Sequence, residues 1–391
     1  MDNFSPKIKT PILLSIFIFL LLSAFILINV PHGSNLAIDK AEPAEAFSEA
    51  AAEAEEPEVV KHLPTPEFVK GLYLTASSFA SAKYRAALLE SLPNGRINAL
   101  VIDIKDSSGH VLYQSQLSEL KETGAIRPVM KDLPELIRKF HELGIYLIAR
   151  QVVFQDALLA QARPELAFKN KSGGLWRNYQ GLYWLDPSKT EVWDYNLAIA
   201  REAAALGFDE INFDYIRYPS DGSLSSLDYN LPAGKTKAEV LKDFFSYLTS
   251  DLRQAEIKSS VDLFGLAVDY AGGDYDLGIG QRFTDAWENF DYVCPMMYAS
   301  HYADNYLGIP NPAEYPGRVL SYGLKRIEPY LAAEPDKFRP WLQAFSLGAA
   351  YGPARINEQA SVIENATTTA GWLFWNARNY YPDYIFDKII E

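Results

Sequence analysis

The segment GFDEINFDYIRYP, residues 207–219, combines an apolar strand pattern with acidic and basic side chains. Successive side chains of a strand point to opposite faces, so Glu210, Asn212 and Asp214 share one face, opposite Ile211. Amide and carboxylate groups on an inward face are costly unless they are hydrogen-bonded or used in chemistry. The pattern therefore predicts a polar site at the carboxyl end of this strand, with Asp214 at its centre.

Polar and aromatic side chains also lie near the ends of the other apolar segments. They are Asp103, Lys105, Arg150, Arg217, Asp262, Tyr298, Gln343, Trp375 and Asn376. Carboxylates among cations and aromatic rings fit glycoside cleavage, in which one carboxyl group protonates the leaving oxygen and another attacks the anomeric carbon or activates water. We predict Asp214 as the nucleophile or base and Asp262 as the general acid. The other eight residues are predicted to bind substrate, with Asp103 and Lys105 on one strand face.

The same acids also fit a non-catalytic role, because Asp103 with Lys105, and Asp214 with Arg150 or Arg217, can form structural ion pairs. The alternative function is then a glycan-binding barrel at the cell surface. A metal-dependent carbohydrate deacetylase needs clustered histidines, but the five histidines are scattered and there is one cysteine, Cys294. We expect neither a metal site nor a cofactor. Retention and inversion of anomeric configuration both remain open.

Eight apolar segments alternate with amphipathic ones. They are residues 68–75, 97–105, 145–153, 208–216, 259–268, 291–298, 339–345 and 371–377. This alternation predicts an α/β fold, a (β/α)8 TIM barrel, whose site lies at the carboxyl ends of the strands. A doubly wound open sheet is the rival fold, but no glycine-rich dinucleotide turn follows the first segment.

Two capping-box patterns mark helix starts in the intervening segments, Ser188 with Glu191 and Thr236 with Glu239. The long connection at 153–187 carries Trp176 and Trp184 among other aromatic residues. It is either a wall of the cleft or a surface loop packed by its own rings.

Residues 11–30 form an apolar run without charges, long enough to cross a bilayer core of roughly 30 Å. Its length favours an uncleaved anchor over a cleaved signal peptide, and preceding lysines keep residues 1–10 cytoplasmic. Residues 31–66, rich in Ala, Glu and Pro, are expected to be a linker, and residues 67–391 an extracytoplasmic barrel. The net charge of -14 argues against a nucleic-acid partner and leaves a polysaccharide substrate and the membrane as partners.

The chain resembles the bacterial putative glycoside hydrolase domain family from about Gly71 to Tyr381. The resemblance lies in VIDIKDSSG, IARQVVFQD, RPELAFKN, GLYWLDP, GFDEINFDYIRYP, PMMYASHY, RPWLQAF and GWLFWNA. It implies a (β/α)8 barrel and glycosidase activity, and places Asp214 on the matching aspartate of the fourth-strand motif. Where many retaining barrel glycosidases have a glutamate at the end of strand five, this chain has Asp262 on that strand. Asp103, Asp269 and Glu288 are the alternative partners of Asp214.

Overall fold

The computed structural model describes residues 61–93 and 95–387. Eight parallel strands form a closed barrel: β1 (Val69–Leu74), β2 (Ala99–Lys105), β5 (Tyr146–Val152), β7 (Glu210–Asp214), β9 (Lys258–Phe264), β10 (Tyr292–Met296), β11 (Trp341–Gln343) and β12 (Gly371–Trp375). The barrel closes because β1 pairs with both β2 and β12. The predicted TIM barrel is confirmed, and each strand overlaps the segment expected for it.

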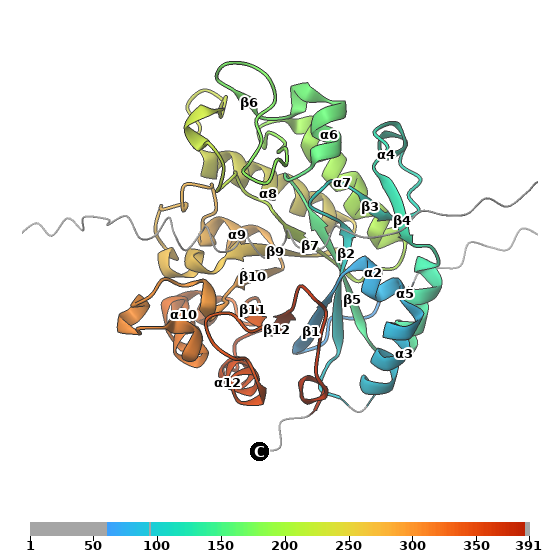
Figure 1. Ribbon diagram of the computed structural model, residues 1–391, viewed down its shortest axis with the longest axis vertical. Helices are drawn as coiled ribbons and strands as arrows, with labels where there is room; N and C mark the ends of the chain where they lie inside the picture. The colour runs from blue at the N-terminus through green and yellow to red at the C-terminus, as the bar shows by residue number, and fades with distance from the viewer. Residues whose placement is uncertain (1–60, 94, 388–391) are drawn as a thin grey trace, which may run out of the picture.

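Helices surround the barrel on the outside (Figure 1). They are α2 (Ala76–Ala80), α3 (Ala82–Ser91), α4 (Ser118–Glu122), α5 (Leu133–Glu142), α6 (Ala157–Ala162), α7 (Thr190–Ala205), α8 (Lys237–Gln254), α9 (Phe283–Asn289), α10 (Pro316–Arg326), α11 (Glu328–Ala333) and α12 (Pro353–Glu364). Four short strands extend the loops: β3 (Val111–Tyr113) and β4 (Ile126–Met130) continue the sheet from β2, and β6 (Lys169–Asn170) pairs with β8 (Leu227–Asp228).

Strand β7 has the predicted two faces. Ile211 and Phe213 belong to the apolar core between strands and helices. On the inner face, Glu210 forms a fully buried ion pair with Arg339, and Asn212 donates to Asp262 over 2.9 Å. Partners from other strands therefore compensate the charge of Glu210 and the amide N–H of Asn212 in the barrel interior.

One of the two predicted capping boxes is present. Thr236 and Glu239 exchange hydrogen bonds at the start of α8. The box at Ser188 is wrong: its hydroxyl donates to Asp186 over 2.8 Å, and Lys189 caps α7 without a side-chain bond. Because α7 begins at Thr190, Ser188 lies one residue before the N-cap, out of position to accept an N–H of the first turn.

The predicted tail at 1–10, the anchor at 11–30 and residues 31–60 of the linker lie outside the described residues. None of the helices in residues 61–93 and 95–387 combines the length and apolar character of a membrane span. Residues 61–66 contact the barrel at the amino-terminal ends of its strands. The backbone N–H of Leu63 donates to Asp209 over 2.7 Å, and the Thr65 hydroxyl lies 3.1 Å from that of Tyr146.

Candidate active site

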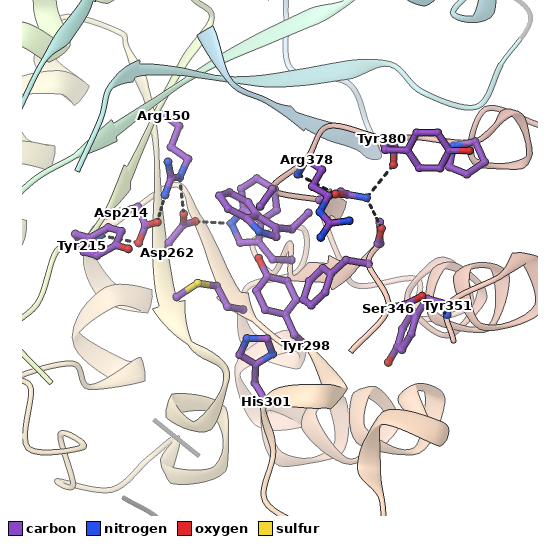
Figure 2. Close-up of a pocket in the computed structure, with 18 of the residues that line it drawn as sticks. Arg150, Asp214, Tyr215, Asp262, Tyr298, His301, Ser346, Tyr351, Arg378 and Tyr380 are labelled. Atoms are coloured by element: carbon purple, nitrogen blue, oxygen red, sulfur yellow. Dashed lines mark hydrogen bonds and ion pairs between the residues drawn. The ribbon is translucent and has the colours of Figure 1, made fainter. Parts of the chain in front are cut away.

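A cavity of about 410 Å³ opens at the carboxyl ends of the barrel strands. Six of the ten residues proposed from the sequence line it: Arg150, Asp214, Asp262, Tyr298, Trp375 and Asn376. Figure 2 shows Arg150, Asp214 and Asp262 together at one side of this cavity. The closed barrel brings them together because their strands, β5, β7 and β9, are neighbours.

Arg150 joins two carboxylates. Its Nη1 donates to Asp103 over 2.5 Å, and its Nη2 donates to Asp214. Asp103 also accepts a 2.5 Å hydrogen bond from the hydroxyl of Tyr73. The second oxygen of Asp214 accepts the backbone N–H of Tyr215 over 2.6 Å. Both oxygens of Asp214 therefore have a donor, and its carboxylate is held in a fixed orientation.

Tyr215 follows Asp214 in a left-handed conformation with φ of 51°, and its side chain lines the cavity. Bulky residues seldom adopt this conformation, and such strain clusters at functional sites. Tyr215 thus marks the point where β7 ends and the following loop begins.

Asp262 has a different environment from Asp214. It is 2% exposed, and its Oδ1 accepts hydrogen bonds from Asn212 over 2.9 Å and from the Trp341 indole over 2.7 Å. Its Oδ2 lies 3.9 Å from Nε of Arg150. Burial, and then the charge of Asp214, raise the pKa of Asp262 well above its usual value. Asp262 therefore favours the protonated form.

The charges explain why one acid stays neutral. Three carboxyl groups, those of Asp103, Asp214 and Asp262, face the single guanidinium group of Arg150. Burial also raises the pKa of Asp103. Because like charges at close range oppose ionisation, the cluster divides into acids of unequal strength.

The other four proposed residues do not line the cavity. The expected shared face of Asp103 and Lys105 is wrong, because a register shift in β2 between them rotates Lys105 outward. Its Nζ is fully buried and contacts Asp156 at 2.8 Å and the carbonyl of Val152 at 2.9 Å. Asp103 lies behind Arg150, out of the cavity wall.

Gln343 and Arg217 support the wall from behind. Gln343 is buried, accepts from the backbone N–H of Ser300 and donates to the carbonyl of Phe345. The guanidinium group of Arg217 lies 4.7 Å from the ring centre of Phe264 and 5.3 Å from that of Tyr215. Both side chains hold loops in place, so neither has the predicted direct access to a substrate in the cavity.

Apart from Asn376, the loop at 376–384, which follows β12, was not among the residues predicted from the sequence. This loop contributes Asn376, Ala377, Arg378, Tyr380, Pro382 and Tyr384 to the lining. The signal available was its density of aromatic and polar residues directly after the last predicted strand.

His301 and Phe345 also line the cavity. Their rings meet edge to face with a centroid distance of 5.9 Å. Burial lowers the pKa of His301 to about 4, so this ring is neutral near pH 7. It acts there as a polar, uncharged part of the wall.

The aromatic loop at 153–187 packs against the segment after β7: the indole N–H of Trp176 donates to the carbonyl of Ser223 over 3.1 Å, and the ring centre of Trp184 lies 6.0 Å from that of Tyr215. Trp176 and Trp184 are almost completely buried and do not line the cavity.

Glu288, one of the alternative partners of Asp214, is also remote from the cavity, because it pairs with Lys242 on the outer surface. Asp269 accepts hydrogen bonds from the hydroxyl of Tyr306 outside the cavity lining. Among the alternative partners, Asp103 alone is connected to Asp214, through Arg150.

Comparison with solved structures finds similar barrels. The glycoside hydrolase domain of PgaB (BpsB) from Bordetella bronchiseptica aligns with a TM-score of 0.58 at 12% identity, over 81% of this chain and 95% of that chain. A chitobiase from Flavobacterium johnsoniae aligns with a TM-score of 0.51 at 13% identity, over 82% and 47%. At sequence identities this low, the similarity shows a shared fold and nothing about function. No curated protein matches the chain.

A hypothetical protein from Ruminiclostridium thermocellum ATCC 27405 is 37% identical over 49% of this chain and 96% of that chain, with a TM-score of 0.46. The family described as "Putative glycosyl hydrolase domain" matches residues 71–381. This match spans every strand of the barrel except the first residues of β1, and it includes Asp214, Asp262 and the loop at 376–384. The chain therefore belongs to this putative glycosyl hydrolase domain family.

Proposed function

We propose that the protein is a glycoside hydrolase that cleaves a cell-envelope or extracellular polysaccharide. Asp214 is the nucleophile or base, and Asp262 is the general acid. The observation that carries the proposal is the unequal environment of these two carboxyl groups on the wall of one cavity. Glycoside cleavage needs one ionised and one protonated carboxyl group on either side of the glycosidic bond.

The contacts of each acid support its role. Asp214 is oriented by hydrogen bonds from Arg150 and from the backbone N–H of Tyr215. On Asp262, Oδ1 is occupied by the donors of Asn212 and Trp341, so the proton belongs on Oδ2. That proton is the one transferred to the leaving oxygen, and Arg150 compensates the charge that then forms on Asp262.

Aromatic rings next to the acids suit a sugar ring. Trp375 stacks on Tyr73 with centroids 3.8 Å apart and meets Trp341 edge to face at 5.5 Å. Rings locked against each other lose little conformational freedom when a substrate packs on them. They favour binding of the flat apolar face of a pyranose.

The proposal includes the location of the enzyme. The apolar run at 11–30 supports a single-pass anchor, with residues 31–66 as the spacer and the barrel outside the cytoplasm. A polysaccharide of the envelope or its surroundings is then within reach of the cavity.

The role of Asp262 is tested by varying the leaving group. Asp262→Asn in the full chain is expected to lose roughly 100-fold or more of its activity on a polysaccharide, but much less on an aryl glycoside whose phenolate leaves without a proton. Asp243→Asn, on the outer helix α8 and paired with Lys235, is the matched control and should keep full activity. An equal loss on both substrates contradicts the acid role.

The second candidate function is a glycan-binding barrel without catalysis. It is favoured by the direct pairing of Arg150 with Asp103 and Asp214, which also occurs in purely structural networks. A panel of polysaccharides assayed separately for cleavage and for binding separates the two. Binding of one glycan together with cleavage of none supports this second function.

A further inference from the structure

Arg378 is the charged residue of the cavity that the proposed cleavage chemistry does not use. The charged side chains of the lining are Arg150, Arg378, Asp214 and Asp262. Arg150 is occupied by its carboxylates, whereas the exposed guanidinium group of Arg378 has no ion pair and no hydrogen-bond acceptor within residues 61–93 and 95–387. Figure 2 shows the acids at one side of the cavity and Arg378 with Tyr380 toward the other.

The loop that carries Arg378 is held firmly. The N–H of Arg378 donates to Oδ1 of Asn376 over 3.0 Å, and Nδ2 of Asn376 donates to the carbonyls of Ala344 and Tyr380, each over 2.8 Å. One residue further on, the side chain of Asn379 accepts the N–H of Thr75 over 2.8 Å. The backbone next to Arg378 is therefore tied to both β1 and the loop after β11.

Asn379 holds the turn in an uncommon conformation, with φ of 51°. Its amide group also donates to the carbonyl of Tyr73 over 3.2 Å, and its own carbonyl accepts the hydroxyl of Tyr84 over 2.8 Å. This many bonds around a left-handed residue fix the path of the chain, and such fixed, strained turns are found at ligand sites. The result is a cation presented to the cavity by a rigid support.

The surroundings of Arg378 suit a sugar. Tyr380 is 70% exposed, and Tyr351, Pro382 and Tyr384 also line the cavity. Rings and a proline offer apolar faces to a pyranose, while a guanidinium group offers paired donors with the spacing of two oxygens of one carboxylate. Neither of the two acidic side chains of the lining lies on this loop.

We infer that the loop at 376–384 forms a subsite for a sugar residue that carries a carboxylate, with Arg378 as its specificity-determining residue. The substrate is then an acidic polysaccharide. This inference rests on the proposed function, which makes the cavity the binding site of a polysaccharide. Binding of the acidic sugar can nevertheless be measured without cleavage. Because the protein has a net charge of -14, long-range attraction does not bring an acidic polymer to it, and recognition depends on a local cation.

The test measures binding by calorimetry to Asp214→Asn protein, so that turnover does not consume the ligand. The probes are a uronic acid oligosaccharide, the same oligosaccharide with its carboxyl groups reduced to alcohols, and a glycan-strand oligomer whose carboxylate is the lactyl group of muramic acid. We expect one of the acidic probes to bind at least about tenfold more tightly than the neutral one, as a charged hydrogen-bonded pair provides. Which acidic probe binds tells a uronate from a lactyl source.

Substitutions of two arginines test whether Arg378 causes the preference for the acidic probe. Arg378→Gln on the same background is expected to bind the acidic probe about tenfold more weakly and the neutral probe unchanged, and Arg378→Lys is expected to be intermediate. The matched control is Arg318→Gln, since Arg318 is an exposed arginine beside the exposed ring of Tyr315 on α10, away from the cavity lining. It should bind both probes like the parent protein.

Three outcomes overturn the inference: equal affinity for acidic and neutral probes, no binding of either acidic probe, or full acidic preference in Arg378→Gln. If one of these outcomes is found in a protein that cleaves neutral glycans, the inference fails and the hydrolase proposal stands. Conversely, an Arg378-dependent acidic preference in a wild-type protein that cleaves none of the polysaccharides supports the subsite and removes the hydrolase proposal.

Discussion

Asp103 and Asp214 accept hydrogen bonds from the two terminal nitrogens of one guanidinium group, Nη1 and Nη2 of Arg150. The three residues come from β2, β7 and the strand β5 between them. Asp103 does not reach the cavity itself, so its influence on Asp214 passes through the orientation of Arg150. Asp103 is thus a positioning residue in the proposed mechanism.

Asp103→Asn tests this link. It leaves Arg150 with one charged partner inside the barrel, and a misplaced guanidinium group should lower kcat roughly 10- to 100-fold with little change in KM. Tyr73→Phe removes only the hydrogen bond to Asp103 and should give a smaller loss in the same direction. A raised KM with unchanged kcat, in protein whose thermal unfolding is normal, contradicts the positioning role.

Trp341→Phe tests the state of Asp262. The indole N–H of Trp341 donates to Asp262 and so favours its charged form, while burial and the charge of Asp214 raise its pKa. Loss of the donor raises this pKa further, and a general acid must be protonated. The alkaline limb of the kcat/KM profile should therefore move up by roughly one pH unit. A downward shift contradicts the assignment of Asp262 as the acid.

The register of β7 and β9 predicts the stereochemistry of cleavage. Asn212 pairs with Ser260 and Phe213 with Val261, so Asp214 and Asp262 follow as the next neighbours on adjacent strands. Both carboxyl groups also approach the one guanidinium group of Arg150, which keeps them close together, as the roughly 5–5.5 Å between carboxyl groups in retaining enzymes requires. We expect the first product detected by proton NMR to retain its anomeric configuration. Inversion would show that Asp214 acts as a base on water.

Asp269 offers a prediction about stability. Burial raises its pKa to about 6, above roughly 4 in an unfolded chain. Its stabilising contribution is therefore complete below about pH 4 and lost as the pH rises through about 6. Asp269→Asn avoids this loss, so its free energy of unfolding should exceed that of wild type by roughly 2 kcal/mol at pH 7.5, and by little at pH 4.

The control for this prediction is Asp304→Asn, on the exposed part of the loop after β10. This substitution should leave the difference in unfolding free energy independent of pH. A destabilised Asp269→Asn at pH 7.5 would mean that the hydrogen bonds from Tyr306 outweigh the burial of the charge.

The barrel was predictable because alternating apolar strands and amphipathic helices are set by burial alone. The inner face of β7 was predictable for the same reason. Lys105 was not, because a register shift in β2 depends on its neighbouring strand and leaves no mark in the alternation of apolar residues. The prediction that Gln343 binds substrate failed for a different reason. Its side chain is used up by hydrogen bonds to the backbone of Ser300 and Phe345.

The cavity wall depends on loops, whose paths follow tertiary contacts more than local sequence. Trp176 and Trp184 had the composition of a sugar platform, but they are buried against the segment after β7, at Ser223 and Tyr215. The loop at 376–384 has a similar composition, yet the bonds of Asn376 and Asn379 place it over the strand ends. The two aromatic loops differ in their long-range hydrogen bonds, such as the one between Thr75 and Asn379, which the local sequence does not show.

The role of Asp214 is tested most directly by comparing cleavage and binding in one variant. For the full chain and a polysaccharide that the wild type cleaves, Asp214→Asn should reduce the release of reducing ends by roughly 1,000-fold or more. Its affinity for an oligosaccharide of the same polymer should stay within about threefold of wild type, because the rings and Arg378 remain. A release rate within about tenfold of wild type would contradict Asp214 as the catalytic carboxylate.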